Sequence, residues 1–88
     1  MPPLSRENIL PRVITIISDV VGIRTKDITE QDLIADDLGA DSLDYTEIGM
    51  MCEDEFKVEI ADHDMQEVCT VRELVDLILA ANPEVSLA

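Results

Sequence analysis

The apolar residues of this chain recur every three or four positions, which is the spacing of helices that bury one face. The clearest stripe lies near the N-terminus and consists of Ile9, Val13, Ile16, Ile17 and Val20. Gly22 follows the stripe and is a typical helix end, because glycine adopts a left-handed backbone without a steric penalty. We place the helix start near Asn8 as the N-cap, so that Pro11 falls in the first turn, where proline is tolerated. Ser5 is a weaker alternative cap.

A second helix is predicted from Asp41, a favourable N-cap residue, to Phe56. Its core face holds Tyr45, Ile48, Gly49, Cys52 and Phe56. The opposite face holds Leu43, Thr46, Glu47, Met50 and Asp54. Two apolar residues, Leu43 and Met50, therefore stand among acids on the outer face. Such a pair is typical of a small docking patch for a partner, although isolated exposed apolar residues are common on any surface.

Two further helices are expected toward the C-terminus. A short one is predicted over residues 62–68, with Met65 and Val68 facing the core. The last helix opens at Thr70 with the sequence Thr-Val-Arg-Glu, a capping box, and is stopped by Pro83. Its apolar stripe consists of Val71, Leu74, Val75, Ile78 and Ala81.

The segment 23–40 is predicted to be a long loop, which is uncommon in a small domain and often functional. Its apolar residues are expected to anchor it on the core. These residues are Ile28, Leu33, Ile34 and Leu38. Strand patterns are weak, and the alternating run KVEI is too short to matter. The predicted fold class is all-α, a four-helix bundle with three longer helices, one short third helix and a long loop between helices one and two.

The size of the chain indicates one domain, because 88 residues support a single small core. We expect residues 1–88 to form it, with a core at roughly 7–81 and short flexible ends. The core should be aliphatic, since the chain has one tyrosine, one phenylalanine and no tryptophan. We find no pattern of a signal peptide and no apolar stretch long enough to span a membrane, so we expect a cytoplasmic protein.

The net charge of −14 is concentrated in one part of the chain. Residues 30–67 contain 14 acids and one base, Lys57. This field repels nucleic acids and anionic membranes, whereas it attracts basic protein surfaces and speeds encounter with them. We therefore expect protein partners with basic surfaces, no nucleic-acid or membrane partner, and a monomer.

The chain offers few groups for catalysis, and we do not expect an enzyme. The single histidine, His63, is expected on an exposed short helix, and Ser42 has no base nearby in the sequence. Cys52 and Cys69 are expected to be buried free thiols. No spacing resembles a zinc site, and the acidic segments lack the ligand and glycine positions of an EF-hand, so no metal site is predicted.

Ser42 is the residue with the most distinctive setting. It follows a turn at Gly39 and lies in the first turn of the predicted second helix, within the run GADSLDYTE. A helix N-terminus offers unpaired N–H groups and a positive dipole end, which favour an attached phosphate. The residues alone leave a second interpretation open, in which Ser42 merely helps to cap the helix.

The run DDLGADSLDYTEI, residues 36–48, resembles the signature of acyl carrier proteins, which place Gly-x-Asp-Ser-Leu at the head of an acidic second helix. Other features of that family follow in order: Val-Gly-Ile at 21–23, Glu-Asp-Glu-Phe at 53–56, a short third helix and Thr-Val at 70–71. The resemblance covers roughly residues 7–81.

The resemblance implies that a phosphopantetheinyl transferase attaches a 4′-phosphopantetheine arm from coenzyme A to Ser42. The thiol of the arm would carry acyl chains as thioesters to ketosynthases, reductases and acyltransferases of fatty acid, lipid or polyketide synthesis. The residues implied for partner binding are Asp41, Leu43, Asp44, Glu47, Met50 and Asp54. The residues implied for the acyl pocket are Tyr45, Ile48, Gly49, Cys52 and Phe56.

The chain departs from the family pattern at several positions. Gly49 stands where a medium-sized apolar residue is usual, and Cys52 where leucine is usual. We expect Gly49 to widen or reshape the acyl pocket, and Tyr45 to offset that room or to bring a hydroxyl near the cargo. Thr46 and Ala61 are milder departures. Together they indicate a specialised carrier rather than the housekeeping one.

Three alternatives stay open at this point. The first is a carrier of amino-acid or aryl units. The second is a structural or regulatory interaction module with the same fold, in which the serine is not modified. The third is an acidic protein that responds to divalent ions.

Overall fold

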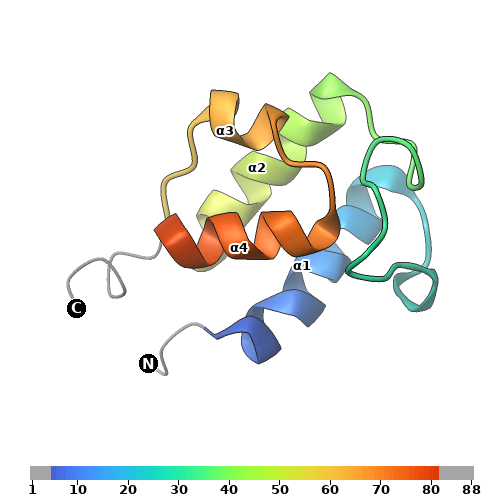
Figure 1. Cartoon of the computed structure of the whole chain (residues 1–88), viewed down its shortest axis with the longest axis horizontal. Helices are drawn as coiled ribbons and strands as arrows, with labels where there is room; N and C mark the ends of the chain where they lie inside the picture. The colour runs from blue at the N-terminus through green and yellow to red at the C-terminus, as the bar shows by residue number, and fades with distance from the viewer. Residues whose placement is uncertain (1–4, 82–88) are drawn as a thin grey trace.

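The computed structural model describes residues 5–81, and this part of the chain is helical (Figure 1). The predicted all-α fold, with three longer helices and a short third one, is confirmed. Within the described range there is no β-strand, and one isolated antiparallel bridge joins Leu33 to Thr70. The elements are α1 (Arg6–Val21), the 3-10 turn η1 (Thr25–Asp27), α2 (Ser42–Phe56), α3 (Asp62–Gln66) and α4 (Val71–Ala81).

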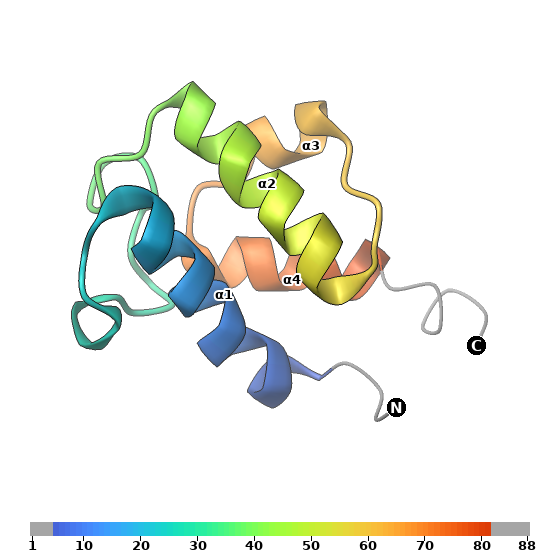
Figure 2. The ribbon, with the colours of Figure 1, turned by 180° about the vertical axis from the view of Figure 1, so that it is seen from behind.

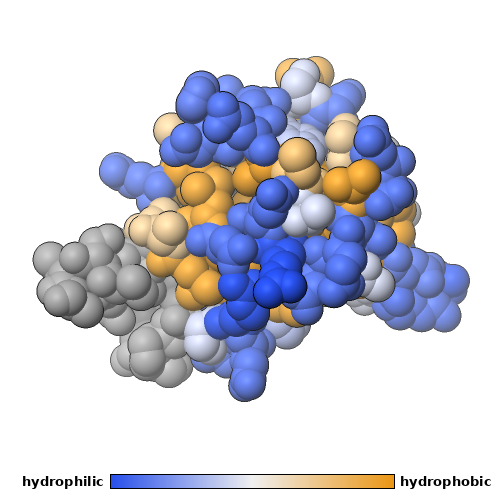
Figure 3. All heavy atoms as spheres, viewed as in Figure 1, coloured by the Kyte–Doolittle hydropathy of each residue, from blue (hydrophilic) through white to orange (hydrophobic). Residues whose placement is uncertain are grey.

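The helices are arranged around α1, which packs against both α2 and α4, while α3 packs against α2. From behind, α2 runs diagonally across the molecule, and the long loop closes the side where α1 ends and α2 begins (Figure 2). The opposite face is largely covered by hydrophilic residues, with apolar surface emerging between α3 and α4 (Figure 3). No helix among residues 5–81 is long and apolar enough to cross a membrane.

α1 begins earlier than predicted from the sequence. Its N-cap is Ser5, whose side chain accepts the N–H of Asn8. The backbone carbonyl of Ser5 also accepts the N–H groups of Asn8 and Ile9. The prediction of Asn8 as the N-cap is therefore wrong, and Pro11 lies inside the helix. The end of α1 at Gly22 is confirmed, with a positive φ of 78°.

The core is aliphatic, as the composition indicated. Eleven side chains are almost fully buried: Ile9, Val13, Ile17, Ile34, Ile48, Cys52, Met65, Val71, Leu74, Val75 and Ile78. Val20 and Ala81, which the stripes placed on the core faces, are only partly buried. Val58 and Ile60 are buried in the connection between α2 and α3, which was not predicted from the run KVEI.

The long loop is anchored by fewer residues than predicted. Ile28, Ile34 and Leu38 are buried, whereas Leu33 is 37% exposed. Ile34 donates its N–H to the carbonyl of Cys69 at 2.8 Å, beside the isolated bridge that joins Leu33 to Thr70. The chain turns directly after this bridge, where the Leu33 carbonyl accepts the N–H groups of Asp37 and Leu38. This contact with the segment before α4 holds Ile34 against the core and leaves Leu33 at the surface.

The predicted capping box at the start of α4 is present. The Glu73 carboxylate accepts the N–H groups of Thr70 and Cys69, both at 2.9 Å, and the Thr70 hydroxyl accepts the N–H of Glu73 at 3.1 Å. Bonding to the two backbone N–H groups, first that of Thr70, lowers the pKa of Glu73. The predicted stop at Pro83 lies outside the described residues.

The position of Pro11 inside α1 leads to a prediction about stability. Proline has no N–H to donate to the carbonyl of Glu7, and its ring crowds that carbonyl, which costs about 3 kcal/mol in a helix interior. Proline also restricts the conformations of the unfolded chain, which stabilises the folded state by about 0.4–1 kcal/mol, and this contribution is lost when proline is replaced. We expect Pro11→Ala to raise the free energy of unfolding by about 2 kcal/mol in urea denaturation.

Pro11→Gly is the matched control, because it restores the N–H with a residue that is about 1 kcal/mol less favourable in helices than alanine. Its free energy of unfolding should lie between those of the wild type and Pro11→Ala. A loss of stability in Pro11→Ala would mean that the helix tolerates proline at this position.

Candidate functional site

The start of α2 is built by a reciprocal pair of carboxylates. Gly39 turns the chain with a φ of 78°, and Asp41 follows as the N-cap. The Asp41 side chain accepts the N–H of Asp44 at 2.9 Å, and the Asp44 side chain accepts the N–H of Asp41 at 3.1 Å. Two of the unpaired donors at this helix end are thereby satisfied. The capping role that Ser42 might have had belongs to these two residues.

Ser42 is the first residue of α2 and is exposed. Its carbonyl accepts the Thr46 hydroxyl at 3.1 Å and the Gln66 side-chain amide at 3.2 Å. Its own hydroxyl has no hydrogen bond to another residue in the range 5–81. The site therefore presents an uncommitted hydroxyl at the positive end of a helix.

The outer face of α2 is exposed and hollowed. Leu43 is 78% exposed and Met50 is 63% exposed, with the exposed acids Glu47 and Asp54 beside them. A hollow of about 570 Å³ lies along this face. Its lining residues are Leu43, Thr46, Glu47, Met50, Met51 and Asp54. We call this hollow with its lining the outer-face groove.

The groove unites four of the six residues expected to bind partners. Asp41 and Asp44 lie at the helix start instead, and each uses one carboxylate oxygen in the capping pair. Met51 was missed, because on the helical wheel it lies between the two faces. The structure shows it half-buried at the edge of the groove.

The inner face of α2 is buried, as predicted for Tyr45, Ile48, Gly49, Cys52 and Phe56. The hydroxyl of Tyr45 donates to the carbonyl of Val68 at 2.8 Å and so ties α2 to the connection between α3 and α4. Burial, followed by the nearby Cys69, raises the pKa of Tyr45. The Tyr45 hydroxyl is therefore already hydrogen-bonded to a backbone carbonyl.

The two cysteines differ in their surroundings. Cys52 is buried, and burial raises the pKa of its thiol to about 12. Cys69 is exposed, so the prediction that it is buried is wrong. It follows Val68, whose side chain enters the core, and lies in the extended connection to α4.

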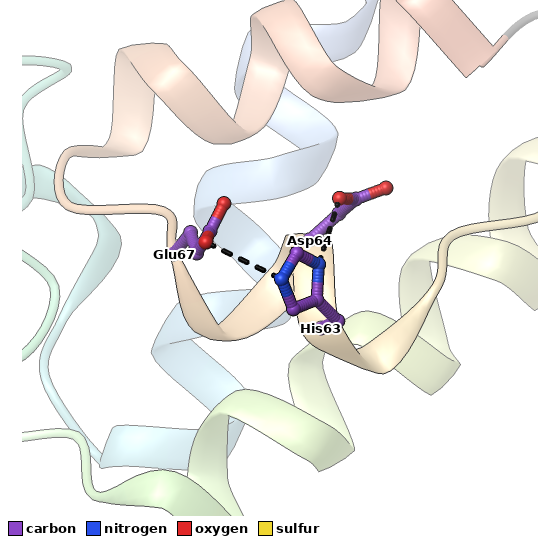
Figure 4. A group of neighbouring side chains, drawn as sticks. All are labelled: His63, Asp64 and Glu67. Atoms are coloured by element: carbon purple, nitrogen blue, oxygen red, sulfur yellow. Dashed lines mark hydrogen bonds and ion pairs between the residues drawn. The ribbon is translucent and has the colours of Figure 1, made fainter.

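His63 is exposed on α3, as expected, and faces two carboxylates (Figure 4). Its Nδ1 lies 3.3 Å from Asp64 Oδ1, and its Nε2 lies 3.4 Å from Glu67 Oε2. The three ligand atoms lie within 4.8 Å of one another and could contact a divalent cation. All three side chains are solvated, and exposed groups of this kind are common without an ion.

Known proteins are similar to this chain in both sequence and fold. The family described as "Phosphopantetheine attachment site" matches residues 11–78. An acyl carrier protein of Thermotoga maritima is 42% identical over 74 residues, covering 84% of this chain and 91% of that protein. The chain belongs to the acyl carrier protein family. A crystal structure of an acyl carrier protein from Thermotoga maritima matches it with a TM-score of 0.76 and 26% identity, covering 91% of this chain and 93% of that one.

The resemblance drawn from DDLGADSLDYTEI is thereby confirmed. The protein is a carrier whose cofactor is 4′-phosphopantetheine, and its function is to carry acyl groups. Proteins of this family work with a transferase that attaches the cofactor and with enzymes that process the acyl group.

The raised pKa of Cys52 makes stability depend on alkaline pH. In the unfolded chain the thiol loses its proton near pH 9.0, whereas the folded chain keeps it up to about 12. Between these values the unfolded state binds fewer protons, so the free energy of unfolding falls as pH rises, by up to about 1.4 kcal/mol per pH unit. We expect Cys52→Ala to show a shallower fall in urea unfolding across this window.

Tyr45 adds a slope of the same sign in both proteins, because its pKa is also raised. The comparison of wild type with Cys52→Ala isolates the thiol. Parallel pH profiles for the two proteins would contradict the assignment of this titration to Cys52.

Proposed function

We propose that Ser42 carries the 4′-phosphopantetheine arm. The observation that carries this proposal is the reciprocal capping by Asp41 and Asp44, which leaves the Ser42 hydroxyl exposed and without a structural role. A phosphodiester at this hydroxyl would lie at the positive end of α2. The terminal thiol of the bound arm supplies the thioester site for the cargo.

The outer-face groove is the proposed docking surface for basic partner enzymes. These are the phosphopantetheinyl transferase and, by class, ketosynthases, reductases and acyltransferases. Leu43 and Met50 supply apolar contact, while Glu47 and Asp54 supply charge that speeds encounter. Asp41 and Asp44 extend this acidic rim at the helix start. A surface of one helix is small, which suits contacts that form and dissociate quickly.

We further propose that the cargo belongs to fatty acid, lipid or polyketide synthesis. The protein would perform no catalysis itself and would act in the cytoplasm as a monomer made of one domain. The aliphatic core supports this proposal, because an acyl chain buried in it gains roughly 0.8 kcal/mol per methylene. Ile48, Cys52 and Phe56 are the proposed core-side walls for that chain, with Gly49 at the α3 side.

The attachment site can be tested by mass. Coexpression with a broad-specificity phosphopantetheinyl transferase should add one phosphopantetheinyl unit to the intact protein, and Ser42→Ala should gain none. Ser5→Ala is the matched control, since it removes a serine at the start of another helix and should still be modified.

A gain in Ser42→Ala would place the arm on another residue. No gain in the wild type with several transferases would instead favour an interaction module with an unmodified serine.

The docking surface can be tested by charge reversal. Glu47→Lys should slow arm transfer about tenfold at low salt, because it weakens steering of the basic transferase, and the difference should shrink as salt rises. Glu7→Lys makes the same charge change at an exposed acid of α1 and should have a much smaller effect. Equal slowing by both variants would show that only net charge matters.

A further inference from the structure

Gly49 and Met65 form a matched pair at the contact between α2 and α3. A Cβ placed on Gly49 would lie 3.0 Å from Cγ and 3.4 Å from Sδ of Met65. The Met65 side chain is 1% exposed, so it fills the space that a side chain at position 49 would take. The volume that a side chain at position 49 would take is therefore filled by Met65.

A hollow of about 210 Å³ adjoins this pair. It is lined by Thr46, Gly49, Met50, Glu53, Ile60, Asp62 and Met65. Met65 and Gly49 both border it, so a movement of the Met65 side chain off Gly49 would join its present space to the hollow. The core side of α2 would then be connected through this space to the molecular surface beside α3.

Met65 can move while α3 stays attached. Methionine is unbranched and has three rotatable side-chain bonds, so it repacks at little cost. Other residues hold α3 on α2: the Thr46 hydroxyl bonds Asp62 at 3.2 Å, and Gln66 bonds the Ser42 carbonyl at 3.2 Å. The contact of α3 with α2 is therefore not made by the Met65 side chain alone.

We propose that Met65 is a movable plug seated on Gly49, and that the pair sets the length and shape of the acyl chain that the protein shelters. The hydrocarbon end of the cargo displaces the plug from Gly49 and takes the space it vacates together with the adjoining hollow. This proposal rests on the proposed attachment at Ser42, which lies two helical turns before Gly49 on the same helix.

The two residues should act in opposite directions. Met65→Ala removes the plug and leaves its space open, so longer or branched chains should fit. Gly49→Val fills the seat and pushes Met65 into the hollow, so the longest sheltered chain should be shorter. Gly49→Ala makes the same change more gently, because its Cβ requires Met65 to move by only a few tenths of an ångström.

The test uses the holo protein loaded with a series of straight acyl chains from butyryl to palmitoyl. The melting temperature of each acyl form is compared with that of the free-thiol form. In the wild type it should rise with chain length until the space is full and then stop rising. Met65→Ala should move this limit up by about three methylene groups, the difference in size between the two side chains, and Gly49→Val should move it down.

Leu79→Ala is the matched control, because it removes as many heavy atoms from a partly buried residue of α4 that lines neither the hollow nor the outer-face groove. It should leave the limit unchanged. If Gly49→Val does not fold, Gly49→Ala gives the same direction of change. A limit that is unchanged in Met65→Ala and in the Gly49 variants would overturn the plug while leaving Ser42 as the attachment site. An intact mass without the arm would instead overturn the attachment site, and the plug with it.

Discussion

The packing of α1 against both α2 and α4 is the interaction on which the rest of the structure depends. Its buried stripe supplies the apolar surface against which the buried faces of α2 and α4 both pack. Arginines of α1 also reach both helices: Arg6 pairs with Asp76, and Arg12 bonds Glu55 at 2.8 Å and lies 4.7 Å from the centre of the Phe56 ring. These pairs are exposed and each is worth little, so burial of aliphatic side chains does most of the stabilising.

Within this frame, structural and chemical roles are divided between neighbouring residues at the start of α2. Asp41 and Asp44 bond to backbone donors at the helix end, and the hydroxyl of Ser42 between them takes no part in this capping. The same separation recurs on the two faces of the helix. Buried residues hold α2 in place, while Leu43 and Met50 leave apolar surface exposed in the outer-face groove.

The sequence predicted much of this arrangement because helical periodicity and capping are local. The bounds of α2, the capping box of α4 and the exposed pair Leu43 and Met50 all follow from spacing. The errors had two causes. The cap of α1 was a wrong choice between two nearby residues, Ser5 and Asn8, whereas Leu33 lies at the surface beside a backbone contact with Cys69 that is distant in the sequence. The contact between Gly49 and Met65 could not be predicted from the sequence either, because a helical wheel shows that a side chain is missing but not which residue fills its place.

The position of Ser42 as the first residue of α2 has a further consequence. The outer-face groove runs along the same rigid helix, at a rise of about 1.5 Å per residue. A partner protein seated in the groove would therefore lie at a set distance and orientation from the Ser42 hydroxyl. On the proposed docking surface, this fixed spacing would let a single docking geometry serve enzymes whose chemistries differ.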